Sequence, residues 1–521
     1  MDNSPAHHGL PFASILYPGS LEAAPVFDQT APSCFQDLRL DQIVAAATTG
    51  HGGNDLGPFF YTPLRDLDAI AYRQEVMRDL EDGQLMEAIR AFGQRMQTMR
   101  GQLAGIEKVY CKPEKERWFL EAVVIYCDAV ERLAQALRIT CPPSSRGLCA
   151  LREYIESYIA SPSFAQLAEG AHALVVSLAN IRYCLRIKGN SVTVRLYDGE
   201  EDYSRVVEGI FEKFRRSGGK DYRSAFGHRV TLNQVEEQIL DRVALLFPEQ
   251  FHALEAYCAS HVEFLDECIT RFDREVLFYV AWLSYIRRYR STGLGFCYPE
   301  LSVTSKEVEA DSAFDLALAG KILDEGRPVV SNDFALRDPE RLLVVSGPNQ
   351  GGKTTFARMF GQLHYLASLG CPVPGRKATL FLFDRLFTHF EKEEDVASLR
   401  GKLKDDLVRI RSILDQATPS SLVVMNEIFA STTFRDAFYL SRQVMAALSD
   451  LDALGVYVTF LTELSTFNEK TASMVGAVDP DDPSIRTFRI ERRAADGLAY
   501  AQAVARKHRV TGEWLRQRIP S

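Results

Sequence analysis

A glycine-rich turn between an apolar run and a helical pattern constrains this chain more than any other feature. Residues 342–345 read Leu-Leu-Val-Val, and the turn after them places Gly347, Gly352, Lys353 and Thr354 in the spacing of a P-loop. Glycines let backbone N–H groups turn toward a polyphosphate, and the positive end of the following helix attracts the same anion. The sequence therefore predicts a phosphate-binding loop. A strand-to-helix turn that binds nothing is the alternative, but both flanks and the Lys-Thr pair favour the P-loop.

The loop residues have expected roles in binding ATP and Mg²⁺. We expect Lys353 to neutralise the outer phosphates and to assist catalysis, and the Thr354 hydroxyl to hold the metal. The nucleotide-binding set predicted from the sequence is Gly347, Pro348, Asn349, Gln350, Gly351, Gly352, Lys353, Thr354 and Thr355.

A second apolar run ends in polar residues and supplies the other half of the predicted site. Residues 421–428 read Ser-Leu-Val-Val-Met-Asn-Glu-Ile. In a P-loop fold such a strand delivers its end to the metal and the γ-phosphate. We predict that Glu427 is the base that orients or deprotonates the attacking water, and that Asn426 is a metal-side residue. An acid usually stands where Asn426 is, and an amide supplies no negative charge. The alternative for Glu427 is a strand-end carboxylate that faces solvent.

The length of 521 residues is too great for a single core, so we expect several domains. Residues 1–58 are rich in Pro, Gly, His and Ala and predict a partly irregular lead-in. Residues 59–295 have mainly helical spacing, with long helices expected near 114–137, 164–185 and 262–286 and a small β-hairpin at 183–197. Residues 296–521 alternate short strands with helices and predict an α/β domain.

The net charge of −9 argues against general binding to nucleic acid, although a local basic surface remains compatible with it. Residues 213–229 mix lysines and arginines with aromatic residues around two glycines, which suits a contact with nucleic-acid phosphates. A solvated loop explains this stretch equally well.

The cysteines and the hydropathy indicate a compartment. Ten cysteines are scattered without a CxxC pair, which is typical of reduced thiols in a cytoplasmic protein. Residues 1–19 do not resemble a secretory signal, and no segment keeps eighteen apolar residues without a charge. We therefore expect a cytoplasmic protein with no membrane partner.

Six motifs follow one another along the chain: Gly347–Thr354, Gly370–Pro374, Asp384–Thr388, Glu394–Arg400, Leu422–Ile428 and Thr432–Asp436. Their order and spacing resemble the MutS DNA mismatch-repair ATPases. The resemblance is specific over residues 296–521 and weaker at residues 62–74 of the helical part. It implies an α/β P-loop ATPase domain of the ABC type, preceded by a helical lever and core domain. It also implies a homodimer that closes over ATP and Mg²⁺ and transmits closure to a DNA clamp, with other repair proteins as possible partners.

The chain also departs from the family pattern. The N-terminal mismatch-reading domain, with its Phe-x-Glu wedge, has no counterpart in this sequence. The family's serine that contacts the γ-phosphate of the partner subunit aligns with Gly401. The histidine after the last ATPase strand is replaced by Glu463, and the aromatic residue that stacks on adenine aligns with Val329. Together with Asn426, these changes predict weaker or differently controlled hydrolysis.

Two function classes follow from these observations. The first is a dimeric, slow ATPase that couples nucleotide state to binding of mismatched, branched or duplex DNA. The second is a nucleotide-gated scaffold with little hydrolysis that grips a protein partner. A chromosome-maintenance type of ABC machine ranks last, because the chain has a single long coiled-coil-like seam at residues 262–286.

Overall fold

The computed structural model describes residues 12–19, 26–50, 55–200, 232–391, 402–482, 485–495, 509–512, 514 and 516. The chain divides into two compact units. The first, here called the sheet unit, comprises residues 1–82, 144–148 and 274–521, and the second, the helical unit, comprises residues 83–143 and 149–273. These units do not follow the sequence division at residue 295, because residues 1–82 and 274–295 group with the C-terminal sheets.

The main sheet has the strand order β10-β11-β12-β7-β13-β14, in which β14 is antiparallel to β13 and the other neighbours are parallel. Its central strands are almost wholly apolar and buried, as expected for a parallel sheet covered on both faces. Their carboxyl ends therefore meet at one edge. The strands are β7 (Leu342–Ser346), β10 (Leu386–Phe390), β11 (Leu422–Asn426), β12 (Leu454–Val458), β13 (Thr471–Val478) and β14 (Arg486–Arg492).

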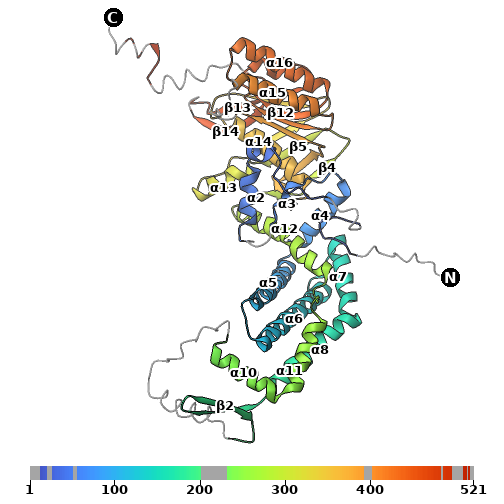
Figure 1. Ribbon diagram of the computed structural model, residues 1–521. Helices are drawn as coiled ribbons and strands as arrows, with labels where there is room; N and C mark the ends of the chain where they lie inside the picture. The colour runs from blue at the N-terminus through green and yellow to red at the C-terminus, as the bar shows by residue number, and fades with distance from the viewer. Residues whose placement is uncertain are drawn as a thin grey trace, which may run out of the picture. The chain divides into compact units, whose positions relative to one another are not determined.

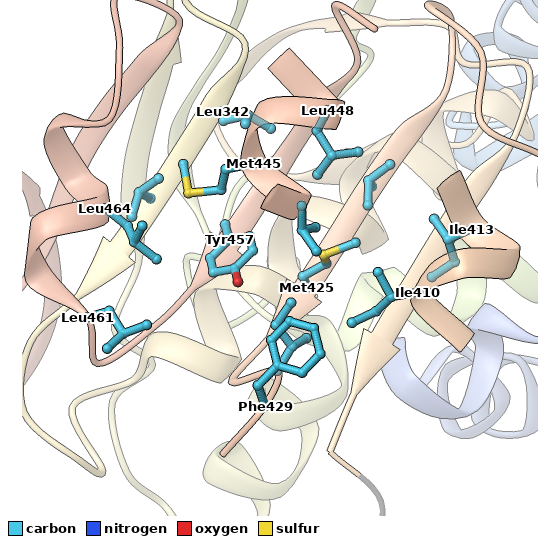
Figure 2. Close-up of a cluster of buried hydrophobic side chains, with 14 of the residues drawn as sticks. Leu342, Ile410, Ile413, Met425, Phe429, Met445, Leu448, Tyr457, Leu461 and Leu464 are labelled. Carbon is cyan, nitrogen blue, oxygen red and sulfur yellow. The ribbon is translucent and has the colours of Figure 1, made fainter. Parts of the chain in front are cut away.

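Helices cover both faces of this sheet (Figure 1). On one face, α14 (Lys353–Ser368) packs against β11 and β12. On the other face, α15 (Lys402–Gln416) and α16 (Phe434–Asp450) enclose a hydrophobic cluster with the strands. Figure 2 shows Met425 of β11 and Tyr457 of β12 in this cluster, with Ile410 of α15 and Met445 of α16. Since side chains alternate along a strand, the neighbouring Asn426 faces the α14 side.

Smaller elements complete the sheet unit. A four-stranded sheet has the order β4-β9-β5-β6, and β3 pairs with β8. The α13 helix (Leu316–Asp324) precedes β6, and a 3₁₀ helix, η3 (Thr462–Thr466), follows β12. The strands are β3 (Phe296–Cys297), β4 (Glu300–Ser302), β5 (Val308–Ala313), β6 (Asn332–Leu336), β8 (Val373–Pro374) and β9 (Lys377–Phe381).

The described part of the N-terminal stretch is more ordered than the sequence predicted. Ile15 and Leu16 are fully buried. The Tyr72 hydroxyl donates to the Ser14 carbonyl at 2.8 Å, and Arg73 Nε donates to the Leu16 carbonyl at 2.8 Å. These partners lie far along the chain, so local composition could not reveal them. The helices here are α1 (Cys34–Leu38), α2 (Leu40–Thr48), α3 (Gly57–Tyr61) and α4 (Leu67–Asp79).

The helical unit contains the predicted long helices and the predicted hairpin. Helix α6 (Lys112–Gln135) packs along α5 (Gly83–Ile106), and the hairpin consists of β1 (Tyr183–Lys188) and β2 (Ser191–Leu196). The long helix expected at 262–286 is α12 (Glu267–Arg290), whose first residues lie in this unit and whose remainder lies in the sheet unit. Within the described part of the chain, no helix is both long enough and apolar enough to cross a bilayer. The remaining elements are η2 (Ala136–Thr140), α7 (Arg146–Ile159), α8 (Pro162–Ala179), α10 (Gln234–Leu246) and α11 (Pro248–Ser260).

Candidate nucleotide-binding site

The loop between β7 and α14 has the backbone that its glycines predict. Gly347 and Gly352 have φ angles of +118° and +93°, which side chains other than glycine rarely adopt. A Cβ atom on Gly347 would lie 2.8 Å from the backbone nitrogen of Gly476 in β13. The first glycine is therefore required both for the turn and for the close approach of the loop to the neighbouring strand.

Lys353 folds back over this loop. Its Nζ donates to the carbonyls of Gly347 and Pro348 at 3.0 and 3.2 Å and to Asn349 Oδ1 at 3.3 Å. The side chain is only 4% exposed. Burial lowers the pKa of Lys353, and the nearby carboxylate of Glu427 opposes that shift. A buried cation is thus held where the loop would enclose a phosphate.

Strand β11 brings its two polar end residues to the same place. Glu427 follows the strand with a φ of +52°, and its backbone N–H donates to the Val458 carbonyl at 3.0 Å. Its carboxylate lies 3.6 Å from Lys353 Nζ. Positive φ in a non-glycine residue costs free energy, so the surrounding structure must hold Glu427 in this conformation. The structure therefore brings together the predicted lysine and the predicted base.

Asn426 fits the metal side of a nucleotide site. It is 7% exposed, and its Oδ1 is buried with no hydrogen-bond partner among the described residues. A buried amide oxygen of this kind is able to accept a hydrogen bond from a metal-bound water. Thr354 lies half-buried in the first turn of α14. This pair offers neutral oxygens, so it suits a Mg²⁺ ion whose other ligands are phosphate oxygens.

One side of the site was missed by the sequence reasoning. The first residues of β14 lie against the loop: Arg486 Nε donates to the Asn349 carbonyl at 3.3 Å, and the Phe488 carbonyl oxygen lies 3.5 Å from a Cβ built on Gly352. Asn332 holds this part of β14, since its Nδ2 donates to the Phe488 carbonyl and its Oδ1 accepts from the Ile490 N–H. The available sequence signal was Gly476, an isolated glycine inside an apolar strand pattern, which often marks a close backbone approach.

The structure describes two of the other predicted features and leaves two outside the described residues. Glu463 lies exposed on η3, and Val329 is half-buried before β6. Gly401 and the basic stretch at 213–229 lie outside the described residues.

The comparison with protein families agrees with this geometry. Residues 343–507 match the model of MutS domain V, the ATPase domain of that family. The match begins in β7, includes the loop, Lys353, Asn426 and Glu427, and extends through β14. The C-terminal α/β part is therefore a MutS ATPase domain, and a largely helical region with a β-hairpin precedes it.

Proposed function

We propose that this chain binds ATP with Mg²⁺ at the β7–α14 loop and hydrolyses it slowly. The observation that carries the proposal is the pairing of Lys353 with Glu427, 3.6 Å apart, at the carboxyl edge of the parallel sheet. Ligands of α/β proteins bind at this edge, beside the N-terminus of the helix that follows the loop.

Lys353 and Glu427 exchange partners when nucleotide binds. In this structure Lys353 Nζ donates to neutral loop oxygens, which are weaker partners for an ammonium group than phosphate oxygens. Its movement onto the phosphates leaves the Glu427 carboxylate available to accept a proton from the attacking water. The carboxylate is 30% exposed, so water can reach it.

Thr354 and Asn426 would hold Mg²⁺ together with the phosphates. The metal supplies positive charge against the phosphate oxygens when it is bound. Because Asn426 contributes no negative charge, the protein holds the metal less firmly than an aspartate at the same position would. This difference supports slow turnover.

We further propose that the protein acts as a homodimer that couples nucleotide state to binding of mismatched, branched or duplex DNA in the manner of mismatch repair. The match of residues 343–507 to MutS domain V supports this, and we include other repair proteins among the proposed partners. Free cysteines support a cytoplasmic location. Burial raises the pKa of Cys34, Cys127 and Cys371, so these side chains stay protonated and unreactive as thiols.

The test is steady-state ATPase activity with and without homoduplex, mismatched, hairpin and four-way DNA across a salt series. In nucleotide titrations we expect the wild type to bind ATP and Lys353→Ala not to bind it. In DNA titrations we expect the logarithm of the DNA affinity to fall steeply with the logarithm of the salt concentration. Absence of ATP binding, or equal binding by Lys353→Ala, would refute the nucleotide site. Nucleotide binding without salt-dependent DNA binding would favour the nucleotide-gated scaffold.

A further inference from the structure

The P-loop has a second cation beside it. Arg486 begins β14, pairs with Val478 across the sheet, and donates through Nε to the carbonyl of Asn349 in the middle of the loop. The β13–β14 ladder shifts register between Gly476 and Val478, and Gly347 lies against that same Gly476. The irregular ladder is therefore the place where the start of β14 reaches the loop.

Arg486 and Lys353 both donate to Asn349, Lys353 Nζ to its Oδ1 at 3.3 Å and Arg486 Nε to its carbonyl at 3.3 Å. Two like charges therefore lie at one segment of the loop, where they repel each other. Arg486 is partly exposed, whereas Lys353 is buried. A polyanion that binds beside both groups relieves this repulsion, and an arginine offers several N–H donors in a fixed plane to phosphate oxygens.

We propose that Arg486 is a second phosphate-binding cation, acting within the same chain, and that it makes nucleotide binding depend less on Mg²⁺. The proposal rests on the ATP binding proposed above. It joins two observations at one site: a positive group lies beside the loop, and the neutral Asn426 stands at the metal side. Protein cations thereby carry part of the phosphate charge that the metal would otherwise balance.

Nucleotide affinity measured with and without the metal tests this assignment. A fluorescent ATP analogue is titrated into the full chain in excess Mg²⁺ and in EDTA, for wild type, Arg486→Gln and Arg486→Lys. We expect Arg486→Gln to weaken binding by about ten- to a hundredfold in EDTA, and by less in Mg²⁺. Arg486→Lys keeps the charge and should recover most of the affinity in EDTA.

Arg411→Gln is the matched control. Arg411 lies on α15, pairs with Asp415, and its side chain is 79% exposed. This substitution removes the same charge from the same unit and should leave the affinity unchanged under both conditions. Thermal unfolding of each variant shows whether β14 remains folded, and Arg486→Met, which removes the charge but keeps an unbranched side chain, supplies the test if Arg486→Gln does not fold.

The outcomes separate the two proposals. If wild type binds the analogue and Arg486→Gln binds equally tightly in EDTA, Arg486 is not a phosphate ligand and ATP binding still stands. If Arg486→Gln weakens binding equally with and without Mg²⁺, the claimed exchange with the metal is refuted. If wild type does not bind under either condition, the nucleotide site itself is refuted and the role of Arg486 with it.

Discussion

Replacing Gly347 with alanine tests whether the phosphate loop depends on its approach to β13. The new methyl group would meet the Gly476 nitrogen at 2.8 Å, its Cα at 3.1 Å and its carbonyl oxygen at 3.2 Å, whereas ordinary contacts measure 3.4–4 Å. The neighbours are backbone atoms inside the main sheet, so they cannot rotate away as a side chain can. The loop must therefore move away from β13 by roughly half an ångström.

Two costs add in this variant. A non-glycine residue at a φ of +118° costs about 1–3 kcal/mol, and the forced contact costs about 1–3 kcal/mol more. The control is Gly326→Ala in the same unit, because Gly326 has a φ of +68° and a Cβ there would meet nothing within 4 Å. It carries the backbone cost alone, about 1 kcal/mol. The difference between the two variants measures the close approach together with the extra backbone cost of a φ of +118°.

Urea unfolding followed by tryptophan fluorescence gives the two free energies, since Trp282 is fully buried in the sheet unit. We expect Gly347→Ala to lose about 2–6 kcal/mol and Gly326→Ala about 1 kcal/mol. In a parallel titration with ATP, Gly347→Ala should bind about tenfold more weakly or worse, because displaced N–H groups no longer match the phosphates. Equal losses of stability, with unchanged ATP affinity for Gly347→Ala, would show that contact with β13 does not shape the loop.

The other expectations concern charge at two places in the sheet unit. Glu427→Gln should retain ATP binding but slow turnover by about 10²- to 10⁴-fold, and equal turnover of wild type and variant would exclude Glu427 as the base. Asn426→Asp should lower stability without ligand and raise the Mg²⁺ dependence of nucleotide binding; no change in a magnesium titration would mean that the metal is held elsewhere. Burial alone would raise the pKa of Asp452, but hydrogen bonds from three cations hold it below its ordinary value, so the stability it contributes is present above about pH 4 and is lost as pH falls. The cations are Lys306, Arg341 and Lys470. Asp452→Asn should therefore lower the free energy of unfolding by about 1–3 kcal/mol at pH 7 and weaken the fall of stability with decreasing pH. An unchanged dependence of stability on acidic pH would contradict this.

Local pattern was sufficient for much of the site. The P-loop spacing and the apolar runs on either side of it specify a buried strand, a turn and a helix, because each depends on neighbours a few residues away. The placement of Glu427 beside Lys353 also followed, since parallel strands of one sheet end at a common edge.

The remainder depends on contacts between distant parts of the chain. Arg486 reaches the loop because β13 and β14 pair with a shifted register. The residue pattern of 486–492 does not predict this register shift. Similarly, residues 12–17 are poor in helical pattern, yet Arg73 and Tyr72 satisfy their carbonyl groups. The family resemblance predicted the ATPase domain, but it did not predict the contacts of Arg486, Arg73 and Tyr72.

The fully buried guanidinium of Arg73 has a consequence for anyone who shortens this protein. It donates to the carbonyl of Leu16 and also to that of Leu369, the residue that caps the C-terminal end of α14. Deleting the first eighteen residues would remove the Leu16 carbonyl and leave a desolvated cation with one acceptor fewer, at the far end of the helix that begins with Lys353. A truncation at the start of the chain therefore changes the packing of the ATPase domain, although the phosphate loop lies more than three hundred residues away in sequence.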